Sequence, residues 1–395
     1  MGNHCGRSSK TANASTPHGS KNPLSTLSDS SLKKSSKKTS TGSDNSVAQF
    51  KSEASTNLKS LNLDYHNAAS NNFSENEGSK TVGLKSFSLT DLKNATKNFS
   101  STSYLGEGGF GCVFKGWIDE HTYAPTKARA GIVVAIKKLK RESSQGYKEW
   151  LAEVTYLSQL HHENLVKLIG YCSEADSKLL VYEYMQKGSL ENHLFKRGVQ
   201  PIPWPTRVSI AIDVARGLSF LHGLETQIIF RDLKASNILL DSDFNAKLSD
   251  FGLARNGPTG DKSHVSTRVV GTRGYAAPEY IATGHLSLKS DIYTFGVLLL
   301  ELLSGRRAVD EDSGASEQTL VDWAKPFLKN KGRMLRIMDI RLEGRYCKKE
   351  AQVIAFLALQ CLHLDPKSRL SMTDILPILE KLREGKDNIT SHARA

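Results

Sequence analysis

Two short segments in the middle of the chain carry residue types suited to phosphate chemistry. "FRDLKASN" places Asp232 five residues before Asn237, and "LSDFG" adds Asp250. Amide and carboxylate oxygens are hard ligands of the kind that Mg²⁺ prefers, so Asn237 and Asp250 are the candidate metal ligands. Asp232 is the candidate that accepts or orients the proton of an attacking hydroxyl, with Lys234 as a point charge beside the transferred phosphoryl group. Any one of these acids, taken alone, is also explained as a turn or cap residue.

A glycine-rich segment, "GEGGFGCV", lies upstream and follows the pattern G-x-G-x-x-G-x-V. Glycines allow a backbone to approach phosphates closely. A dinucleotide fingerprint needs a helix that opens at the motif, but another strand pattern, "CVFKGWI", follows here. We therefore expect a hairpin over the phosphates, although the motif alone also fits an ordinary glycine-rich hairpin. The residues expected to line a nucleotide here are Leu105, Gly106, Glu107, Gly108, Gly109, Phe110, Gly111, Cys112 and Val113.

Lys137 closes the segment "VAIK", and Glu153 follows sixteen residues later. Glu153 lies in a predicted amphipathic helix next to the apolar Val154, where an acidic group needs a partner. Lys137 can pair with Glu153 and also hold the α- and β-phosphates of a nucleotide. Two unrelated surface charges are the alternative, and the upstream glycine loop favours the ion pair.

The elements that position these residues change character along the chain. Residues 1 to about 85 are rich in Ser, Thr, Asn and Lys and are predicted to be disordered. A lead-in helix with a cap at Thr90 is predicted next. Strand patterns rich in Val, Ile and Phe then flank one helix, and the rest of the chain is mostly helical. The sequence thus predicts an α+β architecture, with a strand-rich lobe before a helical one. Its expected parts are the tail 1–85, the lead-in helix 86–104, the first lobe and hinge 105–186, the second lobe 187–386 and a C-terminal tail 387–395.

Composition limits the classes of function. The chain has 395 residues, a net charge of +12 and 5 scattered cysteines without a C-x-x-C pair, which favours reduced thiols over disulfides or a zinc site. It has no apolar run of about 18 residues, so no membrane-spanning helix is expected. The basic charge suits an anionic membrane or nucleotide phosphates, and no nucleic-acid-binding motif accompanies it.

The ordered set of motifs, completed by "GTRGYAAPE", resembles the eukaryotic protein kinases from Leu105 to about Lys386. The resemblance implies a bilobal kinase fold with ATP in the cleft, together with Mg²⁺, or Mn²⁺ in its place. It further implies that Asp291 anchors the catalytic loop and that Arg369 pairs with Glu279. The adenine side of the site is implied at Ala135, at the gatekeeper Tyr182 and at the hinge residues Glu183 and Met185.

A finer resemblance rests on "LGEGGFGCVFKGWIDE", "EWLAEVTYLSQLHHENLVKLIGYC" and "RDLKASNILLD". These segments are similar to plant receptor-like cytoplasmic kinases of subfamily VII. Membership implies serine/threonine specificity, plasma-membrane receptor kinases as partners, and a role in plant immunity or development. An aromatic residue in place of the catalytic-loop His is usual in that group, so Phe230 is expected to pack near Phe251.

The N-terminus, "MGNHCGRSSK", suggests a lipid anchor. Gly2 is required for N-myristoylation and Cys5 offers a thiol for palmitoylation. Gly6 departs from the Ser or Thr expected there, and an unmodified tail is the alternative. A second acyl chain, or the basic cluster between Lys33 and Lys38, would make anchoring stable. We expect a peripheral, lipid-anchored protein on the cytoplasmic face of the plasma membrane.

The segment between "DFG" and "APE" offers a switch. Ser266, Thr267 and Thr272 are the candidate phosphorylation sites, and Arg231 before the catalytic Asp can pair with a phosphate there. The alternative is that these are polar loop residues. We expect phosphorylation of Ser266 or Thr267 to raise activity.

Two functions remain after a dehydrogenase is excluded by the strand that follows the glycine loop. The first is a monomeric serine/threonine kinase that transfers the γ-phosphoryl group of Mg-ATP to protein substrates. The second is a silent kinase-fold scaffold at a receptor complex. Because Lys137, Glu153, Asp232, Asn237 and Asp250 are all present, the active enzyme is favoured.

Overall fold

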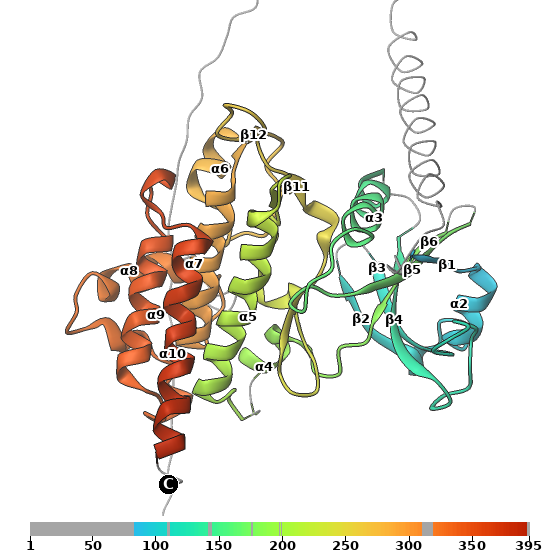
Figure 1. Ribbon diagram of the computed structural model, residues 1–395, viewed down its shortest axis with the longest axis horizontal. Coiled ribbons are helices and arrows are strands. Elements are labelled where there is room, and N and C mark those ends of the chain that lie inside the picture. The colour runs from blue at the N-terminus through green and yellow to red at the C-terminus, as the bar shows by residue number, and fades with distance from the viewer. Residues whose placement is uncertain are drawn as a thin grey trace, which may run out of the picture. The chain divides into compact units, whose positions relative to one another are not determined.

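The computed structural model describes residues 83–108, 111–140, 144–174, 177–196, 198, 200–309 and 319–392. The predicted disordered tail up to residue 82, the acylation candidates Gly2 and Cys5, and Gly109 and Phe110 of the glycine loop lie outside these residues. The described part consists of a strand-rich lobe followed by a helical lobe (Figure 1). The predicted bilobal α+β fold is therefore confirmed.

A mixed sheet forms the first lobe, with the strand order β1-β5-β6-β4-β3-β2. β1 pairs in parallel with β5, and the other neighbouring strands are antiparallel. Helix α3 (Ser144–Leu157) packs on one face, where the indole N–H of Trp150 donates to the carbonyl of Leu179 at 3.1 Å. The strands are β1 (Lys85–Ser86), β2 (Tyr104–Gly108), β3 (Gly111–Ile118), β4 (Ile132–Leu139), β5 (Leu168–Glu174) and β6 (Ser177–Glu183).

The other face of this sheet is covered by the lead-in segment, which contributes β1 and helix α2 (Leu89–Ala95). Side chains alternate between the faces of a strand, so Ile136 lies in this core while its neighbour Lys137 faces α3. β1 can approach β5 because Gly170 has no side chain, and a Cβ there would lie 2.1 Å from the carbonyl oxygen of Lys85. The core on this face comprises Phe87, Leu92, Ala95, Ile118, Val134, Ile136, Cys172, Leu179 and Val181.

The predicted cap of the lead-in helix at Thr90 is wrong. Ser88 is the N-cap, and its hydroxyl accepts the backbone N–H of Asp91 at 3.0 Å. Thr90 lies inside the first turn, because the helix begins at Leu89. Both residues suit a cap by type, so only the position of the helix start decides between them.

The second lobe is built around helix α7, which is buried along nearly all of its length. Its N-terminus has a capping box between Ser287 and Ser290, and its C-cap is Gly305 in the left-handed conformation, with φ 64°. The helices of this lobe are α4 (Leu190–Leu194), α5 (Trp204–Gly223), α6 (Pro278–Thr283), α7 (Leu288–Ser304), α8 (Leu320–Leu328), α9 (Lys348–Cys361) and α10 (Met372–His392). The expected boundary at residue 386 is not a helix end, since α10 continues to His392.

Short strands between these helices flank the segments that contain the candidate catalytic and metal-binding residues. β9 pairs with β7 and β10 around the catalytic loop, and β11 pairs with β8. In the activation segment, which runs from "DFG" to "APE", β12 pairs with β13, which lies beyond that segment. These strands are β7 (Gly188–Ser189), β8 (Ile228–Ile229), β9 (Ile238–Leu240), β10 (Ala246–Leu248), β11 (Arg255–Asn256), β12 (Val265–Ser266) and β13 (His285–Leu286).

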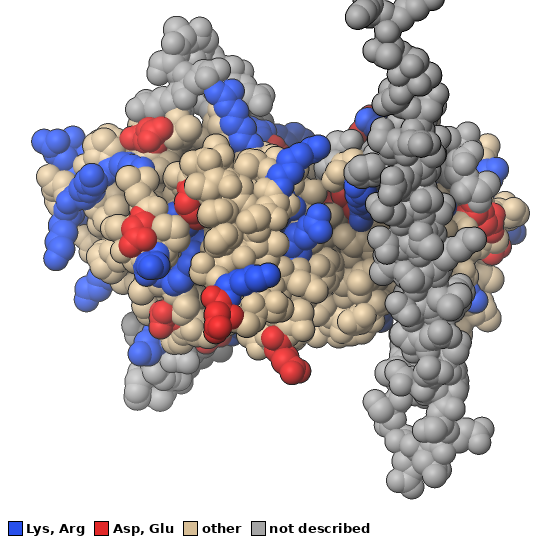
Figure 2. Space-filling model, turned by 90° about the horizontal axis from the view of Figure 1, so that it is seen from above, with Lys and Arg blue, Asp and Glu red and all other residues tan. Residues whose placement is uncertain are grey.

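On the part of the surface that is coloured in Figure 2, basic side chains lie among acidic and uncharged residues. Among the described residues, no helix has both the length and the apolar character needed to cross a bilayer.

Candidate active site

Lys137 links the two lobes. It extends from β4, and its Nζ donates to Glu153 Oε1 of α3 at 2.7 Å and to Asp250 Oδ1 at 2.9 Å. Glu153 is 1% exposed, so its charge is compensated by this pair and not by water. The predicted ion pair is present, and the structure adds Asp250 to it.

Lys137 and Asp250 hold one another in the ionised state. Burial alone would lower the pKa of Lys137, but the nearby carboxylates of Asp250 and Glu153 raise it above its usual value. Burial alone would raise the pKa of Asp250, but the ammonium of Lys137 lowers it. Lys137 is therefore cationic and Asp250 anionic at neutral pH, which are the states that phosphate and metal binding require.

Tyr182 at the predicted gatekeeper position makes a contact that the sequence does not indicate. Its buried hydroxyl donates to Glu153 Oε2, so the two oxygens of Glu153 are held by different side chains. The position of Tyr182 at the end of β6 could be read from the motif, but the direction of its hydroxyl depends on the packing of α3 against the sheet.

The catalytic loop brings Asp232, Lys234 and Thr272 into mutual contact. Lys234 Nζ lies 2.9 Å from Asp232 Oδ2 and donates to Thr272 Oγ1 at 3.0 Å. The Thr272 hydroxyl donates to Asp232 Oδ1 at 2.9 Å. Thr272 was predicted as a phosphorylation site, and the structure places its hydroxyl on the candidate base. In the sequence, only the spacing of Thr272 before "APE" marks this residue. That spacing does not distinguish a phosphorylation site from a hydroxyl that contacts the base.

The candidate metal ligands are held in defined orientations. Asn237 Nδ2 donates to the carbonyl and to Oδ2 of Asp232, at 2.9 and 3.0 Å. Its amide nitrogen is thus engaged, and Oδ1 is the atom suited to a cation. Asp250 adopts the left-handed conformation with φ 68°, which is uncommon outside glycine and occurs at constrained functional positions.

Asp291 of α7 anchors the catalytic loop, as the resemblance implied. Its carboxylate accepts the backbone N–H groups of Phe230 and Arg231, both at 2.8 Å. His222 Nε2 lies 2.9 Å from Asp291 Oδ2. Asp291 is 1% exposed, so the loop is tied to the buried core of the second lobe.

The predicted nucleotide-lining residues lie on the sheet and the hinge. β2 and β3 form the expected hairpin, which carries Leu105, Gly106, Glu107, Gly108, Gly111, Cys112 and Val113. Val113 pairs with Lys137, and Ala135 pairs with Tyr182. Met185 is buried, whereas Glu183 turns away to accept Lys247 Nζ at 2.8 Å. The carboxylate of Glu183 is thus engaged by the second lobe.

The activation segment is held by two arginines. Arg231 donates to the Tyr280 hydroxyl and to the carbonyl of Arg268, both at 2.6 Å, and lies 3.3 Å from Thr267 Oγ1. Arg369 forms the expected bidentate pair with Glu279, at 2.7 and 2.6 Å. Ser266 is exposed in β12.

Comparisons with known proteins agree with this geometry. A family model described as "Protein tyrosine and serine/threonine kinase" matches residues 99–379. "Probable serine/threonine-protein kinase PBL11" from Arabidopsis thaliana is 62% identical over 315 residues, which is 79% of this chain and 81% of that protein. "Serine/threonine-protein kinase BIK1" from the same plant is 57% identical, covering 80% of this chain and 81% of that protein. "Receptor-like cytoplasmic kinase 176" from Oryza sativa subsp. japonica is 56% identical, covering 80% of each.

The family match extends over most of the described residues, and it includes every motif that forms the site between the lobes. Members of the family use ATP and a divalent metal ion. The chain belongs to the protein kinase family, as a serine/threonine kinase of the plant receptor-like cytoplasmic group, subfamily VII.

Proposed function

We propose that the chain transfers the γ-phosphoryl group of Mg-ATP to Ser and Thr hydroxyls of proteins, with Asp232 as the base. The observation that carries the proposal is the double contact of Lys137 with Glu153 and Asp250. A scaffold has no need to align a phosphate-binding lysine with a metal-binding aspartate. Most of the catalysis would then be positioning and charge neutralisation.

The donor set fits a hard divalent cation. Asn237 Oδ1 and the Asp250 carboxylate supply two oxygens, and the phosphates of ATP would supply others, as Mg²⁺ usually requires. When bound, Mg²⁺ neutralises charge on the phosphates; Mn²⁺ accepts the same oxygen ligands. Lys137 would bind the α- and β-phosphates under the glycine hairpin.

The catalytic loop suits a direct transfer. In the proposed step the substrate oxygen forms a bond to the γ-phosphorus, and the bond from phosphorus to the bridging oxygen of ADP breaks. ADP keeps that electron pair, and the hydroxyl proton moves to Asp232. Lys234, 2.9 Å from Asp232, would face the transferred group and balance its charge. Thr272 would hold Asp232 in orientation through its hydroxyl.

Phosphorylation of the activation segment is proposed as the switch. Thr267 Oγ1 lies 3.3 Å from Arg231 Nη2, so a phosphate on Thr267 would meet a guanidinium already in place. Ser266 is the neighbouring candidate, and its exposure suits access by an upstream kinase. Equal activity of wild type and a Ser266→Ala, Thr267→Ala variant would count against this switch. Thr272 is the less suitable site, because its hydroxyl is engaged by Asp232 and Lys234.

The relatives support a place in receptor signalling. One is named a receptor-like cytoplasmic kinase, and we propose that this chain acts with plasma-membrane receptor kinases in immunity or development, as a monomer. Acylation of Gly2 and Cys5 would attach it to the membrane, aided by the basic cluster at Lys33–Lys38. A Gly2→Ala, Cys5→Ser variant that stays in the membrane fraction would exclude this anchor.

The kinase and scaffold proposals separate in one assay. Transfer of labelled phosphate to a generic protein substrate is measured for wild type, Lys137→Met and Asp232→Asn, with Mg²⁺ or Mn²⁺. Activity in the wild type alone supports the kinase. Equal inactivity of all three would favour the scaffold.

A further inference from the structure

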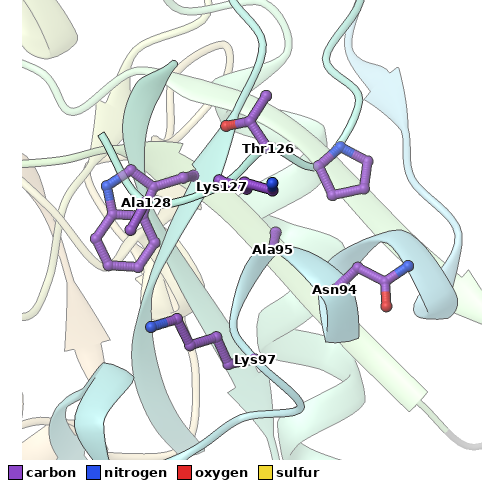
Figure 3. Close-up of a pocket in the computed structure, with 8 residues that line it drawn as sticks. Asn94, Ala95, Lys97, Thr126, Lys127 and Ala128 are labelled. Atoms are coloured by element: carbon purple, nitrogen blue, oxygen red, sulfur yellow. The ribbon is translucent and has the colours of Figure 1, made fainter. Parts of the chain in front are cut away.

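A second cavity lies on the first lobe, and it shares no residue with the site between the lobes. Its volume is about 590 Å³. Figure 3 shows Asn94 and Ala95 of α2 with Lys97 just after the helix, together with Thr126, Lys127 and Ala128 from the loop that joins β3 to β4. The phosphoryl-transfer mechanism uses none of these residues.

The walls combine basic and apolar groups. Trp117, Pro125 and Ala95 supply apolar surface, and Lys97 and Lys127 supply two ammonium groups; among the described residues no Asp or Glu lines the cavity. Both lysines are exposed, and within the described part of the chain neither has an ion-pair partner. Of the two acids of the same loop, Asp119 accepts the backbone N–H groups of His121 and Thr122, and Glu120 is exposed. The described lining of the cavity is therefore basic.

Both walls are held by hydrogen bonds within the protein. On the loop side, Thr126 N–H donates to the carbonyl of Trp117 at 3.0 Å, and Asp119 N–H donates to Ala124 at 2.8 Å. On the helix side, Asn98 N–H donates to the carbonyl of Lys93 at 2.6 Å. A site whose walls are already ordered loses less conformational entropy when a ligand binds.

Backbone strain and an unsatisfied hydroxyl occur at the same place. Five of the nine described non-glycine residues with positive φ lie in the two segments that supply the wall, namely Lys97, Asn98, Phe99, Tyr123 and Arg129, and of these Lys97 lines the cavity. Such conformations cost energy and gather at functional sites. Thr126 belongs to the cavity wall, and its hydroxyl oxygen is buried without a hydrogen-bond partner among the described residues.

We propose that this cavity binds an acidic segment of a partner protein. A carboxylate of the segment lies between Lys97 and Lys127, and an adjacent aromatic or aliphatic side chain packs on Trp117 and Pro125. A free anion would leave the apolar wall uncovered. A membrane surface would not place an apolar group beside an anion inside a cavity, whereas neighbouring residues of a peptide do so.

The test uses the full-length protein and a fluorescein-labelled peptide of alternating Glu and Phe residues. Binding is followed by fluorescence anisotropy, with a Gln and Phe peptide, inorganic phosphate and phosphatidylserine vesicles as the other probes. The variant is Lys97→Glu, Lys127→Glu. The control for net charge is Lys329→Glu, Lys349→Glu, both exposed residues of the second lobe.

The acidic peptide is expected to bind wild type and the control alike, and to bind the Lys97→Glu, Lys127→Glu variant at least about tenfold more weakly. Phosphate transfer to a generic substrate should be unchanged in that variant, which shows that it is folded. A Trp117→Ala variant should weaken binding of the same peptide. Three results would overturn the proposal: equal binding to the double variant, equal binding of the Gln and Phe peptide, or an effect of Lys97 and Lys127 on phosphate or vesicle binding alone.

Discussion

Phe230 packs edge to face against Phe251, with ring centroids 5.1 Å apart and an angle of 75° between the rings. Both side chains are fully buried. Phe230 lies two residues before Asp232, and Phe251 directly follows Asp250, so one aromatic contact joins the segment of the base to the segment of the metal ligand. The predicted proximity of these rings is confirmed, and position 230 is a packing position.

Replacing Phe230 by His should therefore preserve most of the activity. No chemical step is assigned to position 230, so we expect the rate of phosphate transfer to change by less than about tenfold. Phe230→Ala should instead lower the free energy of unfolding by about 3–5 kcal/mol, because it leaves a cavity beside Phe251. Steady-state kinetics and urea denaturation measure the two effects. A loss of rate in Phe230→His as large as that in Asp232→Asn would contradict this account.

Tyr182→Phe should remove one of the two side-chain contacts that position Glu153, while the contact with Lys137 remains. The substitution removes the hydroxyl that donates to Glu153 Oε2 and leaves that oxygen buried. We expect a loss of about 1.5–3 kcal/mol in the free energy of unfolding, and a smaller loss of rate than in Lys137→Met. Tyr184→Phe is the control, since the Tyr184 ring contacts Lys115, whose Nζ lies 4.6 Å from the ring centroid. Equal effects of the two substitutions would show that the Tyr182 hydroxyl contributes nothing.

The lead-in helix should contribute to the stability of the kinase domain itself. Leu92 is fully buried against the sheet, so Leu92→Ala should lower the free energy of unfolding by about 2–5 kcal/mol. Lys93→Ala, on the exposed side of the same helix, should change it by no more than about 0.5 kcal/mol. If both substitutions have the same small effect in chemical denaturation, α2 is an appendage and not part of the core.

Glu301 should make the stability of the second lobe depend on pH. Its side chain is fully buried and accepts the Tyr275 hydroxyl at 2.7 Å and the Ala308 N–H at 3.0 Å. Burial raises the pKa of Glu301 to about 8, from 4.5. The folded chain thus binds this proton more tightly than the unfolded chain does, and the free energy of unfolding falls as the pH rises from about 4.5 to about 8.

A Glu301→Gln variant cannot ionise and should lack this fall. Between about pH 5 and about pH 9, its stability relative to wild type should rise by a few kcal/mol. Urea denaturation at the two pH values measures the difference. Parallel pH profiles of wild type and variant would mean that Glu301 does not titrate in this window.

Features that follow from the order of the motifs were predicted from the sequence, whereas contacts between side chains that are distant in the sequence were not. The order of the motifs predicted the two lobes, and the pairs Lys137–Glu153 and Arg369–Glu279 are found as expected. Features that depend on where distant side chains meet were not predicted. The hydroxyls of Tyr182 and Thr272 reach carboxylates 29 and 40 residues away, and neither direction is encoded in a local pattern. The cap at Ser88 instead of Thr90 was missed because both residue types satisfy the same local rule.

The central claim is that Asp232 is the base of phosphate transfer. The most direct measurement is the single-turnover rate of transfer from bound Mg-ATP to a protein substrate, in wild type and in Asp232→Asn, with ATP affinity measured separately. We predict that the variant binds ATP as wild type does and transfers phosphate roughly 10²- to 10⁴-fold more slowly. An undiminished rate in Asp232→Asn, with ATP bound equally well, would contradict the account.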